Sequence, residues 1–385
     1  MARHEDHREI RESVAKLCAE FAPDYWRDLD ARRAYPTDFV GALTAAGFLS
    51  ALIPEQYGGA GLPLSAAAAI LEEVQRAGGN GAACHAQMYV MGTLLRHGSD
   101  AQKAQYLPRI AAGQLRLQAF GVTEPASGTD TLALRTVARR DGDVYRVTGQ
   151  KIWTSRAEHS DLMILLARTQ PRETVAKKSA GLSVFIVDMG HALANGMTIR
   201  PITTMMNHAT TEVWFDNVPV PAENLIGTEG EGFRYILSGM NAERILIAAE
   251  CIGDAKWFLD KAAGYARDRS VFGRPIGANQ GVQFPIARAY ANMCAAELMV
   301  HAAAAAYEAG ENAGEEANMA KMLAADASWE AANVCLQTHG GFGFANEYDI
   351  ERKFRETRLY QVAPISTNLI YSYVAEHLLG LPRSF

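Results

Sequence analysis

Apolar residues recur at helical spacing in the first third of the chain. Ile10, Val14, Leu17 and Phe21 follow one another at intervals of four, three and four residues, which places them on one face of a helix. Glycines and prolines interrupt this spacing at points where a helix can end. The pattern predicts an all-helical N-terminal domain over residues 1–117.

Between residues 118 and 228 the pattern changes to short runs that are typical of strands. Val144–Thr148 alternates after an Asp-Gly turn, whereas Leu162–Leu166 and Leu182–Val187 are continuously apolar. No long helical pattern separates these runs, so we expect an antiparallel β-barrel or sandwich and not a doubly wound sheet. A nucleotide site of the Rossmann type is therefore excluded.

Helical spacing returns over residues 229–385. Alanine-rich stretches such as His301 to Ala309 and Ala317 to Ala327 suit closely packed helices, and their length predicts a C-terminal four-helix bundle. We expect an α+β multidomain protein with three domains at residues 1–117, 118–228 and 229–385.

Composition narrows the possible partners. The chain has 385 residues, of which 49% are hydrophobic and 21% are charged, and its net charge is -6 without a basic cluster. This balance argues against a nucleic-acid or membrane partner. The five cysteines are scattered and form no CxxC pair, so we expect reduced thiols, no metal site and a cytoplasmic location. The charged N-terminus lacks the apolar core of a secretion signal.

Three motifs carry the chemistry of the sequence. They are FGVTEPASGTD (Phe120 to Asp130), QKIWTS (Gln150 to Ser155) and RSVFGRPIGANQ (Arg269 to Gln280). Together they resemble the flavin site of the acyl-CoA dehydrogenase family, and the resemblance covers nearly the whole chain. The competing interpretation is that the first segment is a turn between domains and that Trp153 is a core residue.

The resemblance implies FAD as the cofactor. A flavin ring needs an apolar slot with hydrogen-bond donors near its nitrogens and carbonyl oxygens. Thr123 and Ser155 match residues that bind the ring, Trp153 matches one that packs on it, and Thr129 matches one near the pyrophosphate and the thioester. Phe120 and Val122 match residues that line the slot. Ser366 and Asn368 match residues of the C-terminal loop that approach FAD. Five further residues match positions that reach FAD from a neighbouring subunit: Arg269, Phe272, Gln280, Gln337 and Gly341. The contacts between subunits imply a homotetramer. Arg269 alone would more often be a surface residue of a helix, but the FGRPI that follows it favours the cofactor role.

The catalytic base is the point at which this chain departs from most relatives. The family removes an α proton from an acyl-CoA thioester with a carboxylate, usually a Glu near the C-terminus. Here that position is Pro364, within QVAPISTN. Proline has no side-chain base, and it also lacks the main-chain N–H that polarises the thioester carbonyl in relatives. Either other donors bind this carbonyl or the substrate binds differently.

A minority of the family, including isovaleryl-CoA and long-chain dehydrogenases, place the Glu on a helix at the position of Glu243. Ile236, Met240 and Ile247 share a helical face with it, so the carboxylate lies on an apolar stripe. Burial there would raise its pKa and suit a base. The alternative is a structural ion pair with Arg244 or with a neighbouring helix.

The resemblance also assigns substrate contacts and an overall activity. Asn241, Arg244 and Thr129 match residues that contact the substrate. The expected function is FAD-dependent α,β-dehydrogenation of an acyl-CoA, with an electron-transfer flavoprotein as acceptor. Two alternatives remain: a flavin-dependent oxidase or oxygenase on the same scaffold, and a non-catalytic protein that binds flavin or acyl-CoA.

Overall fold

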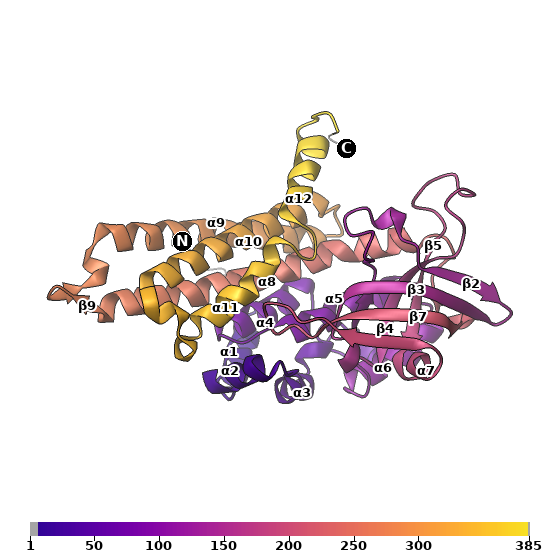
Figure 1. Ribbon diagram of the computed structural model, residues 1–385, viewed down its shortest axis with the longest axis horizontal. Coiled ribbons are helices and arrows are strands. Elements are labelled where there is room, and N and C mark those ends of the chain that lie inside the picture. Colours follow the sequence, from indigo (N-terminus) through magenta and orange to yellow (C-terminus); the bar gives the residue numbers. More distant parts are fainter. Residues whose placement is uncertain (1–6, 384–385) are drawn as a thin grey trace. The chain divides into compact units, whose positions relative to one another are not determined.

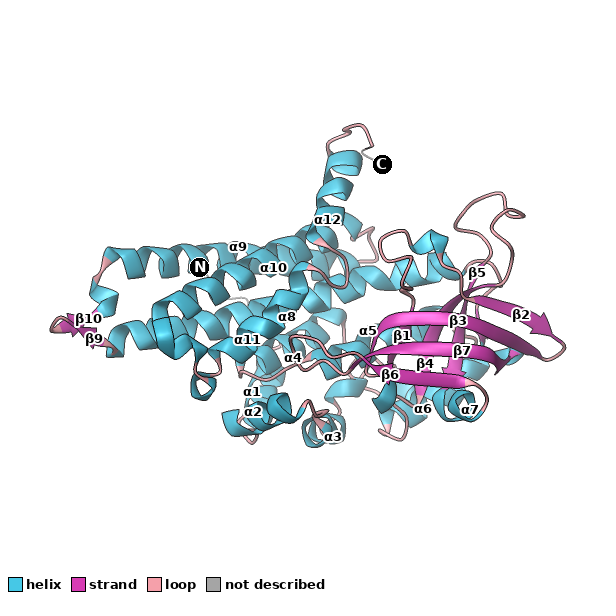
Figure 2. Ribbon diagram, in the orientation of Figure 1, coloured by secondary structure: helices cyan, strands magenta, loops and turns pink. Residues whose placement is uncertain are grey.

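The computed structural model describes residues 7–383. The chain divides into two compact units. We call them the sheet unit (Arg33–Leu62 and Ala82–Met240) and the helical unit (Met1–Arg32, Pro63–Gly81 and Asn241–Phe385). Figure 1 follows the chain by colour, and Figure 2 distinguishes its helices from its strands. The predicted succession of helices, strands and helices is confirmed.

Within the described residues, the sheet unit contains one sheet of eight strands in the order β6-β7-β3-β2-β4-β5-β8, with β1 beside β4. The strands are β1 (Leu117–Gly121), β2 (Val137–Asp141), β3 (Val144–Ser155), β4 (Leu162–Arg168), β5 (Leu182–Asp188), β6 (Met197–Pro201), β7 (Thr210–Pro221) and β8 (Leu225–Ile226). The unit's helices are α3 (Thr37–Ala45), α5 (Ala82–His97), α6 (Asp100–Ala111) and α7 (Met189–Ala194).

The sheet is mixed and not purely antiparallel. β2–β3, β3–β7, β4–β5, β5–β8 and β6–β7 pair antiparallel, as predicted. β1 and β2, however, each pair with β4 in parallel. The alternation of side chains along a strand does not report the direction of its neighbour, so the sequence pattern could not predict these two pairings.

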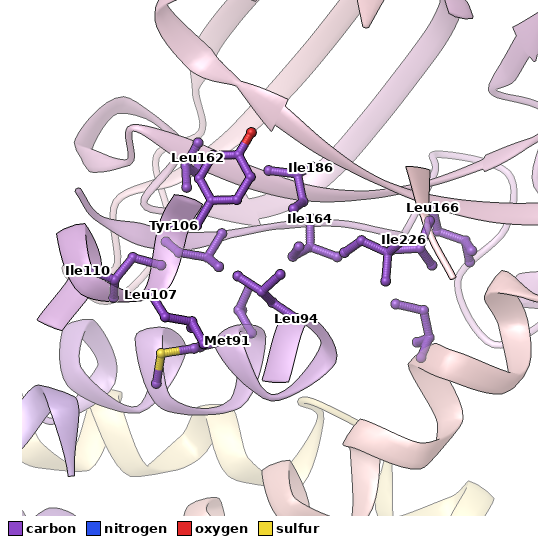
Figure 3. Close-up of a cluster of buried hydrophobic side chains, with 14 of the residues drawn as sticks. Met91, Leu94, Tyr106, Leu107, Ile110, Leu162, Ile164, Leu166, Ile186 and Ile226 are labelled. Carbon is purple, nitrogen blue, oxygen red and sulfur yellow. The ribbon is translucent and has the colours of Figure 1, made fainter. Parts of the chain in front are cut away.

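An apolar core lies between the sheet and the helices α5 and α6. Every residue of β4 is buried, as a central strand requires. Figure 3 shows Met91, Leu94, Leu107 and Ile110 of these helices on one side of a buried cluster that also contains Ile164 of β4. Local sequence also sets the start of α6, because Ser99 and Gln102 form a reciprocal capping box at its N-terminus.

The helical unit consists mainly of long helices. They are α1 (Arg8–Cys18), α2 (Pro23–Arg32), α4 (Leu64–Arg76), α8 (Gly232–Asp268, from Asn241 onward), α9 (Gln280–Glu308), α10 (Gly314–His339), α11 (Ile350–Thr357) and α12 (Thr367–Tyr373), with a short hairpin of β9 (Ser270–Val271) and β10 (Arg274–Pro275). Figure 1 shows α9 and α10 side by side. Their buried faces are rich in alanine, for example Ala303 and Ala324, which permits close approach of the two helix backbones.

A buried polar network joins α4, α8 and α11 inside the helical unit. The Lys353 ammonium is fully buried and forms an ion pair with Asp254. It also donates to the Gln75 Oε1 at 2.6 Å and to the Gly79 carbonyl at 2.9 Å. The Tyr360 hydroxyl donates to Glu250 at 3.2 Å and accepts from Gln75 at 3.0 Å. Buried charges are tolerated because each has such partners.

Over residues 7–383, none of the helices is both long enough and apolar enough to cross a bilayer.

Candidate functional site

The two predicted flavin-binding motifs lie next to each other in the sheet unit. β1 ends at Gly121, and the chain continues through Val122 and Thr123 alongside β3. The Ile152 N–H donates to the Thr123 carbonyl at 2.9 Å. Thr123 and Ile152, which are 29 residues apart in sequence, are therefore held together by the main chain.

A buried ion pair fixes this arrangement. The fully buried Lys151 ammonium donates to the Val122 carbonyl at 3.0 Å and to the Glu124 carboxylate at 2.9 Å. Glu124 also accepts from the N–H groups of Arg135 and Thr136 at 2.6 and 2.8 Å. Burial alone would raise the pKa of Glu124, but Lys151 and these hydrogen bonds outweigh it and lower the pKa. Sequence reasoning missed this pair.

Trp153 has an unusual backbone. Its φ is 60°, which is strained for a bulky residue, and its indole is 57% exposed. At the end of β3, the Ser155 hydroxyl lies 3.4 Å from the hydroxyl of Thr210, the first residue of the neighbouring strand β7. The structure therefore does not support the interpretation of Trp153 as a core residue, since most of its side chain is uncovered.

The rest of the predicted ring site also belongs to the sheet unit. Phe120 and Val122 are partly buried against the apolar cluster of Figure 3, and the Phe120 ring meets Tyr89 edge to face at 5.7 Å. Thr129 is exposed in the turn after Gly128. An exposed indole, partly covered apolar side chains and nearby hydroxyls are the surroundings that an isoalloxazine ring needs, so these residues fit FAD.

The predicted contacts from a neighbouring subunit belong to the helical unit. Arg269 follows α8, and its guanidinium lies 5.7 Å from the centre of the Phe342 ring. Phe272, in the turn between β9 and β10, is fully exposed with φ at 53°. A phenyl ring so exposed is covered by no other residue of the described part of the chain, which suits a residue that contacts another subunit.

Gln280 and Gln337 lie near one pocket. Gln280 is the first residue of α9, and Gln337 is in the last turns of α10. A pocket of about 450 Å³ is formed by Gly281, Val282, Pro285, Asn333, Val334, Gln337 and Thr338. Gly341 follows α10 in a short 3-10 turn. The structure thus brings the ends of two predicted motifs together, in a pocket large enough for part of a nucleotide.

The C-terminal loop leads into α12. Ser366 caps this helix, and its hydroxyl accepts the Leu369 N–H at 3.4 Å. Asn368 is exposed in the first turn of the helix. The Asn368 amide, which is exposed at the capped end of α12, is therefore available to bind a polar ligand.

Glu243 lies on α8, and its side chain is buried. Ile236 and Ile247 are each 4% exposed and Glu243 is 6% exposed, so the predicted apolar stripe is confirmed. Burial raises the pKa of Glu243 to about 7, although Arg244 and Lys321 act in the opposite direction. Among the described residues its carboxylate forms no ion pair, and Arg244 and Lys321 act on it only through their charges. The alternative of a structural ion pair with Arg244 is therefore not realised in the structure.

Arg244 and Asn241 contact each other one turn apart on α8. The Arg244 Nη1 donates to the Asn241 Oδ1 at 2.8 Å. Arg244 is only 8% exposed, and within residues 7–383 its Nε has no acceptor. Burial lowers its pKa, whereas Glu243 raises it. A buried guanidinium with an unused N–H is well suited to bind a polar ligand.

Comparisons with known proteins agree with this geometry. Three family models match: the acyl-CoA dehydrogenase N-terminal domain over residues 4–114, the middle domain over 119–218 and the C-terminal domain over 230–379. The acyl-CoA dehydrogenase FadE12 of Mycobacterium tuberculosis is 32% identical over 386 aligned positions, covering 99% of this chain and 98% of the relative.

Solved structures give the same result. The structure of a glutaryl-coenzyme A dehydrogenase with glutaryl-CoA aligns with a TM-score of 0.91 at 29% identity, covering 100% of this chain and 98% of the other. A chain from the structure of the electron transferring flavoprotein of Acidaminococcus fermentans aligns with a TM-score of 0.92 at 29% identity, covering 98% and 99%. With all three domains matched in order, this chain belongs to the acyl-CoA dehydrogenase family, whose members are FAD-dependent oxidoreductases acting on CH–CH groups.

Proposed function

We propose that this protein oxidises an acyl-CoA thioester to the 2-enoyl-CoA, with Glu243 as the base that removes the α proton. The buried, unpaired carboxylate of Glu243 is the observation that carries the proposal. A base for a weakly acidic α proton works best when its pKa lies near the working pH, and burial achieves this here. The acceptor for the hydride of the β carbon would be supplied by FAD when it is bound.

The other site residues position the two ligands. We assign the ring of FAD to Phe120, Val122, Thr123, Trp153 and Ser155, and the remainder of the cofactor to Thr129, Arg269, Phe272, Gln280, Gln337, Gly341, Ser366 and Asn368. We assign the CoA part of the substrate to Asn241 and Arg244, and the thioester to Thr129. The unused Nε of Arg244 supports its role, because a buried donor without an acceptor costs about 1–3 kcal/mol until a ligand supplies one.

The pH dependence follows from the position of the base. Only ionised Glu243 can accept a proton, and burial raises its pKa to about 7. We expect the rate of flavin reduction to rise with pH through about 7 and to level off above it.

The partners follow from the family. We propose a homotetramer in which the pocket at Gln337 receives part of a neighbour's FAD, and an electron-transfer flavoprotein as the acceptor of the electrons. The exposed Phe272 supports an assembly. A cytoplasmic location completes this proposal. Sedimentation of the purified protein tests the assembly directly.

Anaerobic reduction of the flavin tests the activity. The wild-type protein is mixed with saturated acyl-CoA thioesters of different length and branching, and the loss of visible flavin absorbance is recorded. The Glu243→Gln variant should keep its FAD and lose flavin colour at least about a hundredfold more slowly, the minimum expected for loss of a general base. Glu20→Gln, at an exposed carboxylate after α1, is the matched control and should react like the wild type.

Three outcomes would contradict the proposal. Wild-type rates in Glu243→Gln would show that another group is the base. Rapid reoxidation by air with stoichiometric peroxide would favour an oxidase. Thioesters that bind without any loss of flavin colour would favour a non-catalytic binding protein.

A further inference from the structure

A fully buried lysine on α10 holds the loop that contains Pro364. The Lys321 side chain has no exposed surface. Its ammonium donates to the carbonyl of Tyr360 at 2.6 Å and to the carbonyl of Ile365 at 2.8 Å. These two carbonyls lie at either end of the loop, so a single side chain fixes both ends.

A second residue of α10 also contacts this loop. The Asp326 carboxylate accepts a hydrogen bond from the Gln361 amide at 3.1 Å. Lys321 and Asp326 are five residues apart on one helix. The loop from residue 360 to 365 is therefore attached to α10 through three hydrogen bonds within the helical unit.

The charge of Lys321 is not neutralised by direct contact. Within residues 7–383 it forms no ion pair, since its hydrogen-bond partners are main-chain carbonyls. The titratable groups that act on it are Cys251, Glu243 and Arg244 of α8 and Asp326 of its own helix. Burial lowers the pKa of Lys321 to about 8, so it is protonated at neutral pH.

Glu243 experiences this charge. Burial raises the pKa of its carboxyl, and Arg244 and Lys321 are the two cations that act against burial. Arg244 already shares a hydrogen bond with Asn241 and is assigned to the substrate. Lys321 has no such assignment, and the proposed reaction does not explain why a buried ammonium is bonded to the carbonyls of this loop.

We propose that Lys321 is a positioning residue for the dehydrogenation: its buried ammonium fixes the loop from residue 360 to 365 and supplies a positive charge that favours the ionised form of Glu243. The proposal rests on the role of Glu243 given above. It also accounts for how the loop keeps a fixed shape after Pro364 has replaced the carboxylate found there in most relatives. The loop is fixed from outside by α10 and needs no charged group of its own.

Three substitutions separate the two effects. Lys321→Met removes both the charge and the hydrogen bonds, Lys321→Gln keeps amide donors without the charge, and Lys321→Arg keeps the charge. Gln361→Ala is the matched control, because it removes one attachment of the loop without changing any charge. Lys321→Gln and Lys321→Arg also keep the test open if Lys321→Met does not fold.

The ionisation of Glu243 is measured directly by infrared spectroscopy, without substrate. The carboxylic-acid band that Glu243→Gln removes is titrated with pH in each variant. We expect Lys321→Met and Lys321→Gln to move the midpoint upward by about one pH unit, the lower end of the effect of a nearby opposite charge. Lys321→Arg and Gln361→Ala should titrate like the wild type. An unchanged midpoint in both neutral variants would overturn the proposal.

Hydrogen exchange measures the loop. We expect faster amide exchange over residues 360–368 in Lys321→Met than in the wild type, with Lys321→Gln between them, because the amide can replace only part of the lost bonding. Equal exchange in all variants would refute the positioning role. If Glu243 is not the base, the flavin-reduction experiment fails while the infrared shift persists, so the two proposals fail in distinguishable ways.

Discussion

Glu243→Gln should make the protein more stable at high pH, and the size of the effect follows from burial. The pKa of Glu243 is raised from 4.5 to about 7 in the folded chain. One unit corresponds to about 1.4 kcal/mol, so the difference of about 2.5 units corresponds to about 3 kcal/mol. Between pH 4.5 and 7 the folded state holds a proton that the unfolded state has released. Stability is therefore lost progressively as the pH rises through this range.

Urea denaturation at two pH values measures this effect. At pH 4.5 the wild type and Glu243→Gln should unfold with similar free energies, because the protonated carboxyl and the amide are both uncharged. At pH 8 the variant should be more stable by about 3 kcal/mol. Glu20→Gln, at the exposed carboxylate, should show no such change between the two pH values. All proteins are compared at equal flavin content.

One result would refute the reasoning. If the difference between the wild type and Glu243→Gln were the same at pH 4.5 and pH 8, the carboxylate would not be destabilised by burial. The base in that case would be an ordinary exposed acid, and the physical argument for its role would be lost.

Three further substitutions test the scaffold by urea denaturation. Lys353→Met should lower the free energy of unfolding by about 3–5 kcal/mol, because it leaves the buried Asp254 charge unpaired. Adding Asp254→Asn should restore part of this loss. Equal stability of Lys353→Met and the wild type would contradict the prediction. Ser99→Ala should lower the free energy of unfolding by about 1 kcal/mol, because α6 loses its N-terminal cap. An unchanged urea midpoint would argue against a stabilising role of this cap. Gly149→Ala should lower the free energy of unfolding by about 1–3 kcal/mol, because the added Cβ would lie 2.7 Å from the Thr136 Cα. Gly128→Ala is its control and should unfold like the wild type, because nothing lies within 4 Å of a Cβ at that position.

The sequence predicted the parts of the fold that depend on local spacing. Helical periodicity located the helical segments, and the apolar stripe on α8 predicted correctly that Glu243 is buried. The sequence could not predict the parallel pairing of β1 with β4, because the direction of a partner strand leaves no mark on the spacing of side chains.

The contacts of individual charged residues could not be predicted from the sequence pattern either. Lys151 and Lys321 are both fully buried, yet lysine is among the residues that are rarely buried. Each is tolerated because its ammonium meets main-chain carbonyls from distant segments, Val122 for Lys151 and Tyr360 for Lys321. Only a faint signal was present: Gly149 lies two residues before Lys151, at a point where the register of β3 shifts, and such a bulge can turn a side chain inward.

The parallel pairing of β1 has a consequence for synthesis on the ribosome. Hairpins such as β2–β3 and β4–β5 close soon after they emerge, but β1 needs β4, which begins at Leu162, about 40 residues after Gly121. At about 5–20 residues per second, the nascent chain carries β1 with an open edge for roughly two to eight seconds. An unpaired apolar edge of this kind is prone to aggregate, so translation speed and chaperone access across this stretch should govern the yield of native protein.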